Sequence, residues 1–523
     1  MTLPRFNRRD LLGAGGLAGM GLLLPTALLS GCNGQNTAAP SAASDGPPKR
    51  GGRIRIGTME STQSGNLDAH APVGAGIIRG WALYTKLWEW TKECQPTTAL
   101  AESFEIAPDG RSMVIRLRKG LEFHHGKSVT AEDLIFSVRR LSDPKVASPY
   151  AGLVAAVNRD TIETLDPLTV RLHASEGQGL AALSDAWISF GGIVPTDYHP
   201  VTNVVGTGPF RLKSFTPGQR ATFTRFENYF KPNQPYADEL EILEFKDQTA
   251  RAYALQSGQI DIADLVPVEQ AQLLRRAPGV KVVTSPTNNV QSLDMNVLHP
   301  ALSNVRVRQA LRLLADRKDL VNRALNGEGT IGNDLYSPHD PTYDHSIAQR
   351  PHDPEQAKWL LAKAGYPRLD LTITASAAGA PAALIFAEQA KKAGLALTVE
   401  KLDAASFAAP MPATRAITTG GIPARGFLAS ALHYDAPHAV INRTNFRDPR
   451  FRELIDAAMA QPDVEKRKPL VHEAQHIQHD RGGILIWGFT HVRAAASNNI
   501  GGVVPEKTQF GGWRVDEFWR KDA

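Results

Sequence analysis

The sharpest catalytic pattern in the chain is the zinc-binding motif H-E-x-x-H at residues 472–476. On a helix, His472 and His476 would share one face, and Glu473 would be placed to act as a general base. The third histidine of metzincin peptidases is absent, because Gly482 stands six residues after His476, and His479 lies on nearly the same helical face. A zinc metallopeptidase is therefore kept only as a remote alternative.

Two other kinds of chemistry find less support. The adjacent pair His124 and His125, among 15 histidines, raises a nickel hypothesis, but neighbouring residues do not share a helical face and surface histidines are the simpler interpretation. The chain has no glycine-rich phosphate loop ending in Gly-Lys-Ser/Thr, which excludes the ATPase of a transporter. We therefore expect no catalytic residue, no cofactor and no bound metal.

The N-terminal residues resemble an export signal. Arg8 and Arg9 form a twin-arginine pair, an uncharged stretch runs from Leu11 to Gly31, and Cys32 follows the small residues of a bacterial lipobox. Residues 1–31 are thus predicted to be a twin-arginine lipoprotein signal peptide, with Cys32 as the lipidated residue. An N-terminal transmembrane anchor is the alternative. A loose dinucleotide fingerprint in the same stretch is discarded, since no strand precedes it.

Composition bounds the rest of the chain. The protein has 523 residues, 42% of them hydrophobic, which suggests about three domain-sized units. A net charge of only +5, with basic and acidic residues interspersed, gives no reason to expect nucleic acid. Two cysteines exclude a disulfide framework. Residues 32–52 are polar and rich in Pro, Gly, Ser and Ala, and they predict a flexible tether. A lipid, a tether and a large body favour a capture or scaffold role, although an extracytoplasmic enzyme remains an alternative.

Strands and helices alternate along the body, which predicts a mixed α/β fold. Period-two alternation predicts strands, whereas N-cap residues, apolar faces and terminal glycines predict helices. The expected strands cover residues 53–57, 113–117 and 261–264. The expected helices begin at Thr130 and cover residues 250–257, 306–322, 353–361, 383–393, 448–458 and 469–478.

An ordered series of motifs along these elements resembles the extracellular solute-binding proteins of family 5, the dipeptide-, oligopeptide- and nickel-binding subunits of ABC importers. The resemblance covers essentially the whole mature chain, and the order of the motifs makes it specific. The matching motifs include Phe123-His124-His125-Gly126, Thr130-Ala131-Glu132-Asp133, Gly206-Thr207-Gly208-Pro209-Phe210, Asn228-Tyr229-Phe230, Leu255-Gln256-Ser257-Gly258-Gln259-Ile260-Asp261, Asn296 and Val305-Arg306-Val307-Arg308-Gln309-Ala310.

The resemblance implies an α/β, two-lobed periplasmic-binding-protein-like fold of the cluster C type, with a solute cleft between the lobes. The first lobe would cover residues 53–287, with an extra domain at about 86–205. The second lobe would cover residues 288–487, and residues 488–523 would return to the first lobe. Hinge bending would close the lobes on a solute, and the closed form would dock on the permease. This is binding without catalysis, so the chain is predicted not to be an enzyme.

The resemblance also implies where the solute lies. It places His433, Tyr434 and Asp435 of the second lobe, together with Asn296, at the cleft, with Asp435 as the anchor of a peptide α-ammonium or, alternatively, as a turn residue. Phe427 stands where the family has Trp, and residues 377–383 hold no basic residue for a carboxylate clamp.

We therefore expect a monomeric, lipid-anchored binding protein of the periplasm or cell envelope that delivers peptides to an ABC permease. The alternatives in the same class are a metal chelate or a modified sugar as solute.

Overall fold

The computed structural model describes residues 45–60, 65–403, 406–407, 415–435 and 442–523. The predicted signal peptide, Cys32 and most of the predicted tether lie outside the described residues. Residues 45–523 form one compact unit. Within the described ranges, no helix is both long and apolar enough to cross a membrane.

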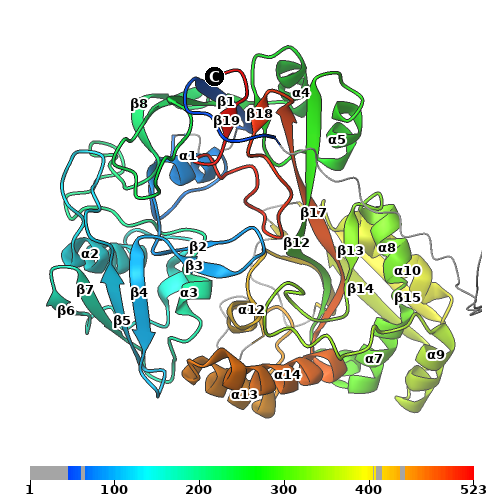
Figure 1. Cartoon of the computed structure of the whole chain (residues 1–523). Helices are drawn as coiled ribbons and strands as arrows, with labels where there is room; N and C mark the ends of the chain where they lie inside the picture. Colours follow the sequence, from blue (N-terminus) through cyan, green and yellow to red (C-terminus); the bar gives the residue numbers. More distant parts are fainter. Residues whose placement is uncertain (1–44, 61–64, 404–405, 408–414, 436–441) are drawn as a thin grey trace, which may run out of the picture. The chain divides into compact units, whose positions relative to one another are not determined.

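One sheet of eleven strands dominates this unit (Figure 1). Two long strands, β12 and β17, lie at its centre and pair antiparallel. In order across the sheet, the strands are β15 (Leu395–Lys401), β14 (Leu369–Ala375), β16 (Ile417–Ile422), β12 (Val280–Met295), β17 (Ile484–Ser497), β11 (Ile262–Ala263), β1 (Arg53–Met59), β10 (Glu239–Phe245), β9 (Arg220–Arg225) and β8 (Phe210–Thr216), and β13 (Gly329–Ile331) pairs with β17.

The two long strands pass from one half of the sheet to the other. The first half of β12 pairs only with the second half of β17, whereas residues 290–294 pair on both sides, with β16 and β17. The register shifts between Pro286 and Val290, where a proline cannot donate a ladder hydrogen bond. Each half has its own strands and helices, and this is the two-lobed α/β fold that the sequence predicts.

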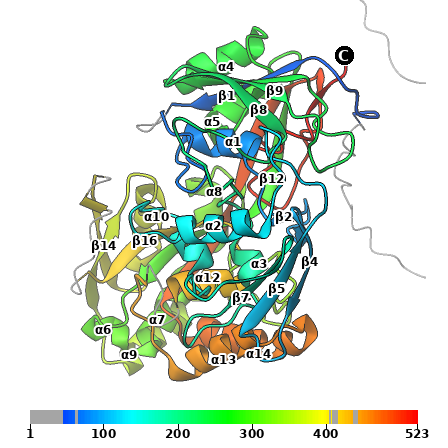
Figure 2. The same cartoon turned by 90° about the vertical axis from the view of Figure 1, so that its left-hand side faces the viewer.

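A smaller antiparallel sheet, here called the side sheet, lies apart from the central one (Figure 2). Its strands are, in order, β4 (Ala101–Ile106), β5 (Ser112–Leu117), β7 (Thr169–His173) and β6 (Glu163–Asp166). Helix α2 (Ala131–Leu141) packs on it and begins as predicted, because the Asp133 carboxylate accepts a hydrogen bond from the Thr130 N–H at 2.9 Å. Short elements follow at η1 (Ala151–Val154) and α3 (Leu183–Ala186). The hairpin β2 (Trp88–Trp90) and β3 (Pro96–Thr98) precedes it.

The buried side chains follow this division. One core joins the side sheet to the strands around β1 and includes Trp88, Trp187 and Phe223. Two further cores fill the other half of the molecule, one around Phe386 and one around Phe427. The pair β18 (Ile500–Gly501) and β19 (Trp519–Arg520) packs with the first core. The C-terminal strand pair therefore lies beside the strands around β1.

Most predicted helices form close to their expected bounds, and their terminal glycines Gly258, Gly365 and Gly394 have positive φ. The helices are α1 (Ala75–Leu83), α4 (Gln248–Gln256), α5 (Val268–Leu274), α6 (Pro300–Ser303), α7 (Val305–Leu314), α8 (Arg317–Ala324), α9 (Pro354–Lys363), α10 (Ala380–Lys391), α12 (Phe427–Tyr434), α13 (Pro449–Ala460) and α14 (Val464–Arg481).

Two helix predictions were inaccurate. The single helix expected over residues 306–322 is two helices, because Asp316 leaves the helical conformation and caps α8 by accepting a hydrogen bond from the Asp319 N–H. The helix expected from Pro469 begins earlier, since Asp463 caps α14 and Pro469 is accommodated inside it.

Candidate functional site

Helix α12 is the element around which the candidate site is built. It buries Phe427, Leu428 and Ala431 in the core around Phe427, here called the second-lobe core. Its N-cap is Gly426, which has no side chain to cap with, and the Asp340 carboxylate does so instead by accepting a hydrogen bond from the Phe427 N–H at 2.7 Å. Two cavities flank this helix. Both also have walls formed by residues between β2 and α3 (88–186), here called the side-sheet region.

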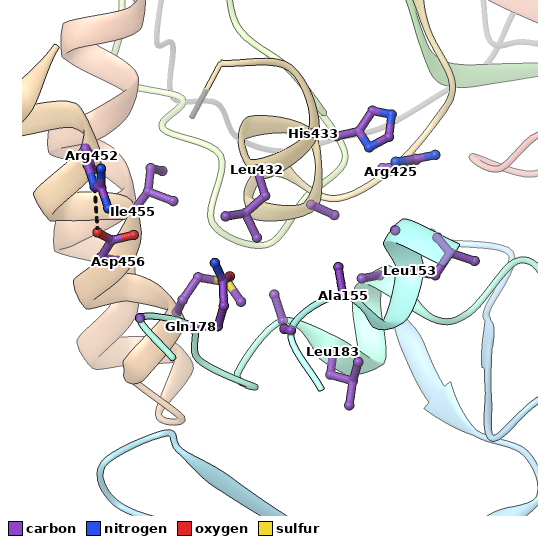
Figure 3. A pocket seen from close by; sticks show the side chains of 17 residues that line it. Leu153, Ala155, Gln178, Leu183, Arg425, Leu432, His433, Arg452, Ile455 and Asp456 are labelled. Atoms are coloured by element: carbon purple, nitrogen blue, oxygen red, sulfur yellow. Dashed lines mark hydrogen bonds and ion pairs between the residues drawn. The ribbon is translucent and has the colours of Figure 1, made fainter. Parts of the chain in front are cut away.

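The first cavity, here called the apolar cavity, has a volume of about 160 Å³ (Figure 3). Leu432 and His433 of α12, Ile455 of α13, and Leu153 and Leu183 of the side-sheet region line it. Arg425 lines the same cavity, and among the described residues its side chain forms no hydrogen bond or ion pair, whereas Arg452 is paired with Asp456. The cavity thus offers apolar walls with one uncommitted guanidinium, which suits an anionic group on an apolar body.

The second cavity, here called the acidic cavity, has a volume of about 210 Å³. Its walls combine Trp90 and Phe104 with the carboxylates of Asp185 and Asp340. Burial, with Asp340 nearby, raises the pKa of Asp185 to about 8. The remaining lining residues include Cys94, Asn288, Gly426, Leu428, Val464 and Arg467.

The three consecutive residues predicted to contact solute occupy different environments. His433 lines the apolar cavity, and burial beside Arg425 lowers its pKa to about 4, so the ring is neutral at pH 7. Tyr434 is buried and packs its ring edge-on against His433, with centroids 4.6 Å apart. Asp435 is completely buried at the end of α12.

The carboxylate of Asp435 is only partly satisfied. Its Oδ2 accepts hydrogen bonds from the Tyr336 hydroxyl at 2.5 Å and from Gln478 Nε2 at 2.9 Å. Within the described part of the chain, Oδ1 has no hydrogen-bond donor. Burial raises the pKa of Asp435 to about 6. This carboxylate has one free acceptor, so its assignment as an amine anchor stays a prediction.

Asn296 lies in the turn that follows β12, apart from α12 in the chain. Its Nδ2 donates to the Arg415 carbonyl, and its Oδ1 accepts from the Leu298 N–H and from Asn445 Nδ2. These bonds give it a role in holding the turn, and its predicted contact with solute is untested.

The zinc motif lies on α14 but is not assembled for catalysis. Glu473 is turned to Arg450, with Oε1 2.8 Å from the arginine Nε. His472 and His476 lie beside the single carboxylate of Asp344. Across the described residues, no group of three or more His, Cys, Asp or Glu side chains could hold a metal ion.

Four residues of the two cavities are not predicted from the sequence: Arg425, Asp185, Asp340 and Arg467. Arg425 comes directly before Gly426 and helix α12, where the family resemblance places the solute contacts. This position is the one sequence signal for Arg425. The two carboxylates come from segments far apart in the chain, and no local pattern joins them.

Comparison with known proteins agrees with this architecture. The family model for bacterial extracellular solute-binding proteins, family 5 (middle part), matches residues 95–431. Heme-binding protein A of Haemophilus influenzae is 32% identical over 341 residues, covering 57% of this chain and 61% of that protein. The glutathione-binding protein GsiB of Escherichia coli K12 is 28% identical over 305 residues, covering 57% and 59%. The chain spans about three fifths of the length of these curated relatives.

A solved structure shows the same fold over nearly the whole chain. DppA of Helicobacter pylori, in complex with the peptide STSA, superimposes with a TM-score of 0.71 at 21% identity, covering 90% of this chain and 99% of that one. The family match extends over more than half of the chain, and the members of the family are solute-binding proteins of ABC importers, not enzymes. The chain belongs to the bacterial extracellular solute-binding proteins of family 5, as the motif series predicts.

Proposed function

We propose that this protein captures peptides between its lobes and delivers them to the permease of an ABC importer. The observation that carries the proposal is the pairing of charges around α12. The acidic cavity presents the carboxylates of Asp185 and Asp340, and the apolar cavity presents the guanidinium of Arg425. A peptide carries an ammonium, a carboxylate and apolar side chains, and it can match all three features.

The printed names of the relatives do not agree on the solute. One is called heme-binding, another glutathione-binding, and the DppA structure holds a peptide. The mixed charge of the two cavities favours a zwitterionic solute, and Asp435 Oδ1 is a further acceptor for an ammonium. A metal chelate or modified sugar would have to use these same charges.

The proposal includes closure of two lobes, at residues 53–287 with 488–523 and at residues 288–487, and an extra domain near residues 86–205. The register shift between Pro286 and Val290 supports a hinge there, because an interrupted ladder bends more easily than a regular one. We also propose that the protein is a monomer and that a lipid on Cys32 holds it to the membrane.

Native mass spectrometry of protein purified from cells without denaturation tests the solute. We expect a spread of small adducts that fragment as peptides, and the same spread from Asp160→Asn, an exposed site away from both cavities. One discrete adduct that does not fragment as a peptide would replace the peptide by another solute. A stoichiometric zinc adduct lost in His472→Ala would overturn the binding role.

A further inference from the structure

Two carboxylates from different parts of the molecule meet at Gly426. Asp185 belongs to α3 in the side-sheet region, whereas Asp340 follows Tyr336, which packs in the second-lobe core. A Cβ built on Gly426 would lie 1.8 Å from Asp185 Oδ2 and 2.8 Å from Asp340 Oδ2. Both oxygens therefore crowd the same small volume above the glycine, and only a residue without a side chain leaves room for them.

The two carboxylates differ in how they are satisfied. Asp340 accepts hydrogen bonds from the Phe427 N–H and from the N–H and hydroxyl of Thr342. Asp185 accepts no hydrogen bond and forms no ion pair within the described residues. Arg467 lines the same cavity but donates to the carbonyls of Gln461 and Pro462. At neutral pH the walls thus hold one ionised carboxylate, one guanidinium and the protonated Asp185, and an added cation would be balanced when Asp185 releases its proton.

We propose that Asp185 and Asp340 together bind a cationic group of the solute, and that this cation couples binding to docking of the side-sheet region on the second lobe. The inference rests on the proposed function and specifies the part of the solute that this site reads. Without a cation, the buried Asp185 keeps its proton at neutral pH, because burial and the nearby Asp340 raise its pKa to about 8, and the two side chains have no charge attraction that would favour docking. With a cation between them, the same pair holds the two regions together.

The docking contacts agree with such coupling. The Ala181 N–H donates a hydrogen bond to the Met459 carbonyl at 3.2 Å, which joins the side-sheet region to the end of α13. A Cβ on Gly179 would lie 2.3 Å from that same carbonyl oxygen. Ala182, the next residue along, packs into the second-lobe core. The backbone of residues 179–181 therefore contacts the backbone of Met459 only a few residues from Asp185. We infer that Asp185 and Asp340 come together only when this contact forms.

The cavity also limits the chemistry of the cation. Its volume of about 210 Å³ is about seven times the volume that one water molecule occupies in liquid water, which is enough for one side chain or a small amine. Trp90, Phe104 and Leu428 provide apolar walls beside the carboxylates. The ligand class is therefore an ammonium or guanidinium on an apolar stem, which is either the N-terminal ammonium of a peptide or a basic side chain.

Isothermal titration of the mature protein with matched probes tests the inference. The probes are tri-alanine and Ala-Lys-Ala, each free and N-acetylated, and n-butylammonium with n-butanol as its neutral counterpart. We expect the wild type to bind a cationic probe at least about tenfold more tightly than its neutral partner. Asp185→Asn should remove that preference, and Asp160→Asn, the same change at an exposed site, should keep it. The free and acetylated peptides show whether the cation is N-terminal or a side chain.

A second variant and a second measurement keep the result independent of folding. Gly426→Ala displaces the Asp185 carboxylate without altering its charge and should also abolish the preference. In small-angle scattering, a cationic probe should make the wild type more compact and leave Asp185→Asn unchanged, since only the wild type can form the pair of carboxylates around the cation.

The outcomes separate the two claims. Peptides that bind without any preference for a cation, or a preference that survives in Asp185→Asn, overturn the inference and leave the peptide function standing. An Asp185-dependent preference for butylammonium in a protein that binds no peptide supports the inference and refutes the peptide. A wild type with no preference for any cationic probe overturns the inference.

Discussion

The hydroxyl of Tyr336 donates a hydrogen bond to the carboxylate of Asp435, and neither side chain has any exposed surface. Gln478 donates a second hydrogen bond to the same oxygen. These two donors stabilise the ionised form, but burial has the larger effect and raises the pKa of Asp435 to about 6. The folded protein therefore holds this proton over a range of pH in which the unfolded chain has released it.

The first prediction concerns the pH dependence of stability. Because the pKa of Asp435 is higher in the folded state, its favourable contribution is complete below about pH 4 and is lost as the pH rises to about 6, which corresponds to about 3 kcal/mol. Asp435→Asn cannot ionise, so its melting temperature relative to the wild type should rise between pH 4 and pH 7. Melting curves at both pH values measure this, and a difference that is constant with pH would contradict it. The nearby Asp294 is present in both proteins, so its own titration cancels in the comparison.

The second prediction concerns docking of the side-sheet region. In Gly179→Ala the new Cβ would lie 2.3 Å from the Met459 carbonyl oxygen, which is backbone and cannot rotate away. Solute affinity should fall at least about tenfold, because the docked form is less populated. Gly421→Ala is the matched control, since its nearest neighbouring atom is 3.7 Å away. Equal affinities of the two variants in calorimetry would show that docking does not contribute to binding.

Much of the fold could be predicted from the sequence because its signals are local. The Thr130–Asp133 capping pair and the glycines with positive φ each act within a few residues, and the structure confirms them. The expected helix over residues 306–322 failed for a physical reason. Apolar residues occur on both sides of the break, at Leu311 and Leu314 and again at Leu320 and Val321, whereas the break itself depends on Asp316 accepting a hydrogen bond from the Asp319 N–H. The spacing of apolar residues does not show that an aspartate side chain will bond the backbone and end the helix.

The candidate site was harder to predict because it depends on contacts between distant segments. The family resemblance located the segment from Phe427 to Asp435. It could not show that Tyr336 and Gln478 enclose Asp435. The approach of Asp185 to Asp340 depends on the tertiary structure alone. Most carboxylates in loops stay in contact with water, and only the tertiary packing determines which of them are desolvated.

The third prediction concerns the zinc motif. Glu473 is paired with Arg450, and both side chains are about half exposed, so this pair contributes little to stability. Glu473→Ala should leave solute binding unchanged and shift the melting temperature by on the order of 1 °C. His472→Ala is tested beside it in calorimetry and in a peptidase assay with and without zinc. Zinc-dependent hydrolysis by the wild type that disappears in Glu473→Ala would contradict this prediction.

The fourth prediction concerns membrane attachment. The sequence holds two cysteines, and the proposed function requires Cys32 to carry the lipid. Cys94 is the matched control, because it is buried against Asn288 and burial raises the pKa of its thiol, which leaves it unreactive. Labelled palmitate fed to cells should be incorporated into the wild type and Cys94→Ala but not into Cys32→Ala, and Cys32→Ala should leave the membrane fraction. Since lipidation at a lipobox requires the cysteine thiol, label retained in Cys32→Ala would place the attachment elsewhere, and a wild type without label would refute the anchor altogether.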